Sequence, residues 1–403
     1  MRRRAHAPLI VIVMAVASAS ASAQPKERSR ADLFEQLGAP DAQRATALAA
    51  QAALLIAEAE STAPSDWETV CRTTLGLRAG SDSVSSLRGK ARALDELARE
   101  ALRSQARVQA AIDRIERARA LAPSDPALIH AHAGALSLWQ ELGPPWECSV
   151  TRRDDEAITL LEQLTRQHPS YAPERVAFEL GVLLTRSSRF EEATAAYARA
   201  DALSLDGDSG IARANMAETQ MLSGDLDAAI ASYTHALERA QQGHGHALAV
   251  WGLAMALERS GDHARAIERL QRAFGAGGEA LLVLRGEGVF FVPPYEVHAY
   301  EALGHEARAS LLASPAEQST ELRAAATSHR AFLAGAAHAA RLGAPAASGA
   351  AHAAATAASY EATAREGLTR VLKKLEAVTK EDKKAKRRGQ KKPAPTRLET
   401  LTR

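Results

Sequence analysis

Cysteine, aromatic residues and long apolar runs are all scarce in this chain. Its 403 residues include two cysteines, and Phe, Trp and Tyr together make up 4%. After the first residues, no segment has the roughly 20 apolar residues that a membrane-spanning helix needs. The sequence has no Cys, His and carboxylate set at metal-ligand spacing, and its glycines lack the spacing of phosphate-binding or dinucleotide-binding loops. We therefore expect no metal, no cofactor and no enzymatic activity.

Residues 1–23 have the pattern of a secretory signal peptide. Three arginines at positions 2–4 precede an apolar run at 9–17, and Ala21-Ser22-Ala23 fits a small-residue cleavage site. The apolar run is too short to span a bilayer, although an uncleaved anchor is the alternative. We expect the mature chain to be exported, as a periplasmic or secreted protein.

The two cysteines, Cys71 and Cys148, form an even pair. In an oxidising compartment such a pair is first interpreted as one disulfide. A bridge closing a loop of this length contributes about 4 kcal/mol to stability in the chain-entropy model. Two separate buried thiols are the alternative.

Charge is distributed unevenly along the mature chain. From Lys373 to the end there are 12 basic and 4 acidic residues, whereas residues 24–372 carry 35 basic and 44 acidic ones. Residues 380–403 have too few apolar residues to form a core, so we expect a disordered basic tail. Such a tail is suited to anionic envelope polymer or lipid, and the export signal disfavours nucleic acid.

A helical fingerprint recurs along the chain: an Ala, a large apolar residue four positions later, and an Ala three after that. The anchors at 193, 229 and 266 are spaced by 36 and 37 residues, a period typical of stacked helical pairs. The copies are Ala111/Ile115/Ala118, Ala193/Tyr197/Ala200, Ala229/Tyr233/Ala236 and Ala266/Leu270/Ala273, with a weaker one at Ala157/Leu161/Leu164.

These residues resemble the tetratricopeptide repeat, in which helix A carries Leu-Gly or Leu-Ala and helix B carries the Ala/aromatic/Ala series. Helix A matches at Leu180-Gly181, Met216-Ala217 and Leu253-Ala254, and Gly-Asp pairs at 224–225 and 261–262 are expected to form turns. The resemblance implies an all-α solenoid of helical hairpins wound into a right-handed superhelix.

The best repeats are expected at 174–207, 210–243 and 247–280, within an array spanning 92–280. Weaker repeats are expected at 92–125 and 127–170, the second interrupted by GPPWECSVTRR. A helical region at 24–91 precedes the array. An extended segment and a degenerate capping hairpin at 281–345 follow it, and then an Ala-rich segment and a C-terminal helix at 346–379.

The resemblance implies that helix-A side chains line a concave groove for a partner protein or peptide. Their alternative role is packing between repeats. A clamp for a C-terminal carboxylate is not expected, since Phe178 and Val182 stand where it needs Lys and Asn. The candidate groove residues are Phe178, Val182, Arg186, Ala214, Glu218, Met221, Trp251, Met255 and Arg259.

Other patterns are weak indications of chemistry. GDSG at 207–210 falls between two helical repeats, where no strand-rich scaffold exists for a serine-protease triad. His130 and His132 lie two apart on a helix and point to different faces, and His244 and His246 are expected in a glycine-flanked loop.

Two functions are therefore open. The first is a non-enzymatic periplasmic scaffold or adaptor that binds a partner protein through its groove, in a cell-envelope assembly. The alternative is a structural envelope factor tethered through its basic tail to anionic polymer or lipid.

Overall fold

The computed structural model describes residues 41–62, 84–143, 150–204, 210–239, 243–276, 294–342 and 350–390. The predicted signal peptide, both cysteines and the extended segment after Ala276 lie outside these residues. The described residues are almost entirely helical, which confirms the all-α prediction. The chain divides into two compact units, Met1–Asp208 and Ser209–Arg403, which are described separately.

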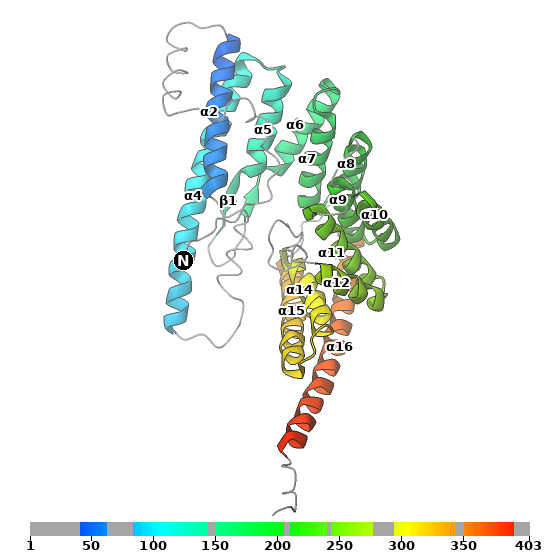
Figure 1. Cartoon of the computed structure of the whole chain (residues 1–403). Coiled ribbons are helices and arrows are strands. Elements are labelled where there is room, and N and C mark those ends of the chain that lie inside the picture. The colour runs from blue at the N-terminus through cyan, green and yellow to red at the C-terminus, as the bar shows by residue number, and fades with distance from the viewer. Residues whose placement is uncertain are drawn as a thin grey trace, which may run out of the picture. The chain divides into compact units, whose positions relative to one another are not determined.

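The first unit contains six described helices and a small hairpin (Figure 1). The strands β1 (Gln140–Leu142) and β2 (Val150–Arg152) pair antiparallel, with Glu141 opposite Thr151. The helices are α2 (Asp41–Thr62), α4 (Val84–Leu121), α5 (Pro126–Leu138), α6 (Asp154–Gln167), α7 (Pro173–Arg186) and α8 (Phe190–Leu203).

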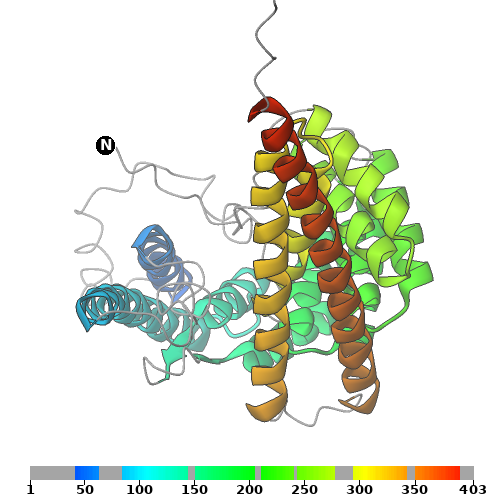
Figure 2. The same cartoon turned by 90° about the horizontal axis from the view of Figure 1, so that it is seen from below.

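The second unit contains three helical hairpins and a long final helix. Figure 2 shows α15 and α16 side by side, and these two helices make extensive contact. The elements are α9 (Ile211–Leu222), α10 (Leu226–Arg239), α11 (Gly243–Arg259), α12 (His263–Ala276), the 3-10 turn η3 (Pro294–Glu296), α14 (Val297–Ala309), α15 (Pro315–Leu342) and α16 (Ala350–Gln390).

Small residues let neighbouring helices approach closely, both within one repeat and between successive repeats. A Cβ atom on Gly181 of α7 would lie 2.7 Å from the ring of Tyr197 on α8, and one on Gly252 of α11 would overlap the ring of Tyr233 on α10. Both tyrosines are buried. The recurring sequence pattern therefore reflects close helix packing. Each glycine faces an aromatic ring, and that ring fills the space between the two helices.

The Gly-Asp turns have the predicted conformation. Gly224 and Gly261 have φ values of 88° and 91°, which an L side chain rarely adopts. Each turn closes its helix with the paired hydrogen bonds of a Schellman motif: Asp262 N–H donates to the Leu257 carbonyl and Gly261 N–H to that of Glu258. The Asp225 carboxylate then accepts from the N–H of Ala228 and begins α10.

The weak repeat expected at 92–125 is wrong. Helix α4 runs unbroken from Val84 to Leu121, with no turn between the two expected helices, and packs along α2. Ala111, Ile115 and Ala118 are buried as the fingerprint requires. Their partner helix is α2, the described helix that precedes α4.

The boundaries expected near the C-terminus also need correction. The Ala-rich segment from 350 and the helix expected at 361–379 form one continuous helix, α16. That helix extends to Gln390, so disorder does not begin at Lys380 as predicted. Residues 391–403 of the predicted tail lie outside the described part of the chain.

Candidate functional site

The helix-A face of the second unit is the surface formed by α9, α11 and α14, the first helices of its three hairpins. Most of the residues predicted to line a groove are not accessible. Six of the nine are buried, namely Val182, Ala214, Met221, Trp251, Met255 and Arg259. Phe178, Arg186 and Glu218 are partly buried. These six positions do not form an open groove in the described structure, and their role in partner binding stays a prediction.

Helix α11 has no open face over most of its length. Every residue from Ala249 to Arg259 is buried. Its neighbours are α9, α10, α12, α14 and α16, all in the second unit. The C-terminal helix α16 thus covers the side of α11 that would have faced a partner. Tyr360 and Ala364 of α16 belong to the same apolar core as Trp251 and Met255.

Tyr360 anchors the upstream part of α16. Its hydroxyl donates a hydrogen bond to the backbone carbonyl of Met221 in α9. The guanidinium of Arg259 lies 3.8 Å from the centre of the Tyr360 ring, within cation–π range. Arg259 also forms a buried ion pair with Glu296 of η3. The aromatic ring and both charges are therefore fixed together on the helix-A face.

Glu218 lies beside this cluster. Burial and the nearby Glu296 raise the pKa of Glu218 to about 7, although Arg259 opposes the shift. The Glu218 carboxylate therefore binds a proton as the pH falls through about 7. The Arg259 charge remains fixed, because the Glu296 carboxylate and the rings of Tyr360 and Tyr300 raise its pKa against the effect of burial.

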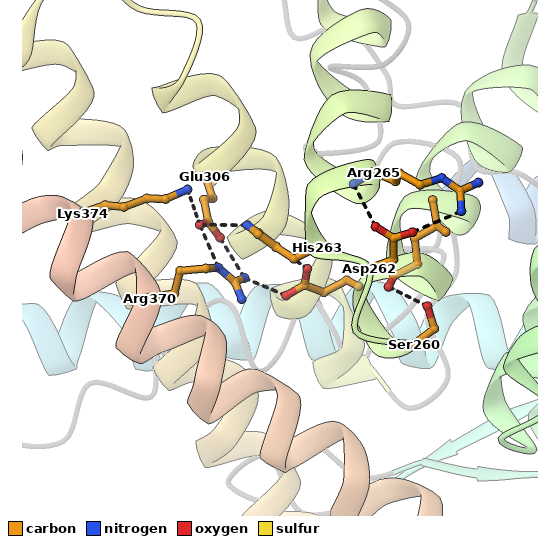
Figure 3. A network of polar contacts seen from close by, with 9 residues as sticks. Ser260, Asp262, His263, Arg265, Glu306, Arg370 and Lys374 are labelled. Atoms are coloured by element: carbon orange, nitrogen blue, oxygen red, sulfur yellow. Dashed lines mark hydrogen bonds and ion pairs between the residues drawn. The ribbon is translucent and has the colours of Figure 1, made fainter.

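A second polar cluster fixes α16 further along the chain (Figure 3). Arg370 donates through Nη2 to Glu258 Oε1 of α11 at 2.7 Å, and through Nε to Glu306 Oε1 of α14 at 3.1 Å. Lys374 Nζ lies 2.9 Å from the same Glu306 oxygen. The ring of His263 bridges the two carboxylates, with Nδ1 2.5 Å from Glu258 and Nε2 3.4 Å from Glu306.

The two carboxylates of this cluster are buried but stay ionised. Burial alone would raise the pKa of Glu306, but contact with His263, hydrogen bonds from Arg370 and the charge of Lys374 hold it well below its ordinary range. The pKa of Glu258 is lowered in the same way by His263 and Arg370. The hydrogen bond with Glu258 and the nearby Glu306 carboxylate raise the pKa of His263 despite its partial burial.

Close packing against α15 completes the docking of α16. A Cβ atom on Gly367 would lie 2.6 Å from the ring of His329 on α15. Val371 is fully buried and packs with Leu322, Ala325 and Ala326 of α15. Burial lowers the pKa of His329 to about 4, so this ring is neutral at physiological pH. Gly367 therefore sets how near the two helices can approach.

In the first unit, the candidate residues also make internal contacts. Phe178 packs edge-on against Tyr197, with ring centroids 5.7 Å apart. Arg186 donates to Asp154 Oδ1 at 2.6 Å and to the carbonyl of Ser137. These contacts favour the alternative weighed from the sequence, in which helix-A residues complete the packing between repeats.

The histidine pairs do not form metal sites in the described structure. His130 is buried and lies 2.6 Å from Glu179. His132 contacts Arg119, and burial lowers its pKa to about 4. His244 and His246 begin helix α11, not a loop as expected. Among the residues that the structure describes, no cluster suits a metal ion and no helix is long and apolar enough to cross a membrane.

Comparison with protein-family models agrees with the repeat assignment. Residues 208–276, spanning α9 to α12, match the tetratricopeptide-repeat family model. No curated protein matches the chain. Among solved structures, the chain is similar to MamA (residues 41 to the end) from Desulfovibrio magneticus RS-1 and to a MamA RS-1 ArsTM double mutant. Each is 14% identical at a TM-score of 0.35, covering 46% of this chain and 93% of the other.

A TM-score this low establishes no shared arrangement, so the assignment rests on the family match and on the hairpins themselves. Both hairpins in the matched segment have the small helix-A residues, buried Ala positions and glycine turns described above. Repeats of this kind form protein-interaction scaffolds. Residues 208–276, from α9 to α12, therefore form tetratricopeptide repeats.

Proposed function

We propose that this chain is an exported, non-enzymatic scaffold or adaptor of the periplasm, and that it binds a partner protein in a cell-envelope assembly. The observation that carries the proposal is the docking of α16. The helix-A face of the second unit holds a helix through an aromatic anchor, apolar contacts and buried carboxylates. Binding an amphipathic helix on such a surface is a recurring mode of protein recognition.

The buried acids and histidine fit this structural role better than catalysis. Glu258 and Glu306 both face cations from α16, and His263 bridges them. The carboxylate oxygens of Glu258 and Glu306 are thus all engaged by side chains from other elements of the fold. This is the expected state of carboxylates that hold two helices together.

Partner binding can be tested by affinity capture from an envelope extract with the full-length protein. Phe178 is the partly exposed aromatic at the helix-A positions of α7, so Phe178→Glu should remove a partner that binds there. The matched control is Arg199→Glu, at an exposed position on helix B of the same hairpin. A partner list that is identical for the wild type, Phe178→Glu and Arg199→Glu would contradict binding through the helix-A positions of α7.

Export can be tested by cell fractionation. The full chain with a C-terminal tag should appear in the periplasmic fraction with residues 1–23 removed. A version lacking those residues should stay in the cytoplasm. Mass analysis of the exported protein also tests the Cys71–Cys148 disulfide, since bonded and free thiols differ in mass and in alkylation.

The C-terminal part of α16 favours a second function, attachment to anionic envelope polymer or lipid. The helix continues through residues 380–390, which carry six basic and two acidic residues. Basic helical segments are attracted to anionic surfaces in a salt-dependent manner. Replacing these six basic residues with Gln should abolish co-sedimentation with anionic vesicles at low salt. Unchanged co-sedimentation would contradict the attachment.

A further inference from the structure

The contacts of α16 with the other helices of the second unit follow a regular pattern along one face of α16. Tyr360, Ala364, Gly367, Val371 and Lys374 are spaced by four, three, four and three residues. The first four are buried, and the fifth reaches Glu306. This alternating spacing keeps one face of a helix against its partner. The stripe runs from an aromatic through small and branched residues to a cation.

The surface beneath the stripe is complementary to it in charge. Glu258 and Glu306 are 7% and 0% exposed, and their carboxylates face Arg370 and Lys374, one helical turn apart. A buried carboxylate without a cation is strongly destabilising, so this site requires a basic helix and rejects an acidic one. At the other end, the Met221 carbonyl accepts a hydroxyl donor.

The ion pairs lie at the edge of the interface, whereas the aromatic anchor lies inside it. The side chains of Arg370 and Lys374 remain 27% and 42% exposed. Separation of α16 can therefore begin at these exposed cations, and it would open the two buried carboxylates to a competing helix. The tether of α16 to its own chain gives it a high effective concentration, which weakens the apparent affinity of any competitor.

We propose that Glu258 and Glu306 form a receptor site for a basic amphipathic helix of the partner, and that α16 is the resident helix which the partner replaces. This inference rests on the proposed scaffold function and names the partner by its chemistry. The partner helix carries an aromatic hydroxyl, then small or branched residues at four-three spacing. An Arg/Lys pair lies ten and fourteen residues after the aromatic.

The test measures binding of a labelled peptide with the sequence of residues 356–380 to the full-length protein by fluorescence anisotropy. The release variant is Arg370→Glu/Lys374→Glu, which removes both cations from α16 and leaves the receptor carboxylates intact. The control variant is Arg365→Glu/Lys373→Glu, which makes the same charge change at exposed positions on the outer face of α16.

The release variant should bind the peptide at least about tenfold more tightly than the wild type, because the resident helix no longer competes. The control variant should bind it like the wild type. A peptide carrying the same two Glu substitutions should bind neither protein. Circular dichroism and thermal unfolding verify that the variants keep their repeats. Gly367→Ala provides a second release variant, since its Cβ would clash with His329 without any change of charge.

Equal peptide affinity for wild type, release and control variants would overturn the proposal. So would dimerisation of the release variant that the peptide does not reverse, because α16 of a second copy would then be the occupant. Neither result depends on capture through Phe178, which lies in the first unit. Suppose that Phe178→Glu loses the partner and that the release variant does not bind the peptide. The scaffold function would then stand, and the receptor site at Glu258 and Glu306 would be rejected.

Discussion

The hydroxyl of Tyr360 donates a hydrogen bond to the carbonyl of Met221, although the two residues are 139 positions apart. The same carbonyl accepts the N–H of Gly224 in the turn that ends α9. Carbonyls in the last turn of a helix lack partners within the helix. A side chain of α16 therefore completes the end of α9, at a residue that the sequence places in the partner groove.

Removing this hydroxyl should weaken α16 docking. We expect Tyr360→Phe to lower the free energy of unfolding by about 1 kcal/mol, the usual net value of one hydrogen bond. Tyr360→Leu should cost more, because it also removes the ring that Arg259 contacts. Chemical denaturation of the wild type and the two variants measures both losses of stability. Equal stability of the Phe and Leu variants would contradict the cation–π contact.

Neutralising Glu306 should weaken α16 docking and flatten its acid dependence. The folded state holds the pKa of this carboxyl below its unfolded value of about 4.3, so its contribution is present above that pH and lost as the pH falls further. Glu306→Gln removes the charge that Arg370 and Lys374 face, at a cost of about 3 kcal/mol. The difference in thermal unfolding between wild type and variant should be constant from pH 7 to about pH 5 and should narrow as the pH falls towards 3.

Glu218 should have the opposite pH dependence. Its pKa is raised to about 7, so the folded state binds a proton more strongly than the unfolded state. Stability contributed by the protonated group is present below an unfolded pKa of about 4.3 and lost as the pH rises to about 7. Glu218→Gln should therefore be more stable than the wild type by roughly 1–2 kcal/mol at pH 8. Calorimetry at pH 5 and pH 8 measures the difference, and an equal effect at both would contradict the shift.

The turn between α7 and α8 has Ser188 where the next two repeats have glycine. Its φ is 57°, and the N–H of Arg189 closes the same motif on the Leu184 carbonyl. An L side chain is strained in this region, whereas glycine is not. Ser188→Gly should therefore stabilise the chain by about 0.5–1 kcal/mol, and Gly261→Ser should destabilise it. Urea denaturation of the two variants should show opposite shifts.

The repeats could be predicted from the sequence because their signals are local. Gly181 and Tyr197 lie within one hairpin, and the Gly-Asp turns carry their own backbone requirement. The continuity of α4 could also be predicted, because no Gly or Pro lies between Lys90 and Leu121. Lys and Glu have high helix propensity, so tail residues rich in them continue a helix that is already packed. The ion pair between Glu376 and Lys380, four residues apart, supports this continuation.

The docking of α16 was not predictable in the same way. The stripe that faces the second unit includes Ala364 and Gly367, whose small side chains give little hydropathy signal among many alanines. The contacts of Arg370 join residues 64 and 112 positions apart, and no local pattern specifies which carboxylates it meets. The available clue was the four-three spacing from Tyr360 to Lys374, beside buried acids on α11 and α14.

Oxidation of Met255 is the measurement that tests most directly whether α16 covers the helix-A face. Met255 is 3% exposed in the middle of α11. Peroxide treatment followed by mass spectrometry should show it protected in the wild type and in Arg365→Glu/Lys373→Glu. It should be oxidised at least about tenfold faster in Arg370→Glu/Lys374→Glu, where the covering helix is released. Rapid oxidation of Met255 in the wild type, or equal protection in all three proteins, would contradict this account.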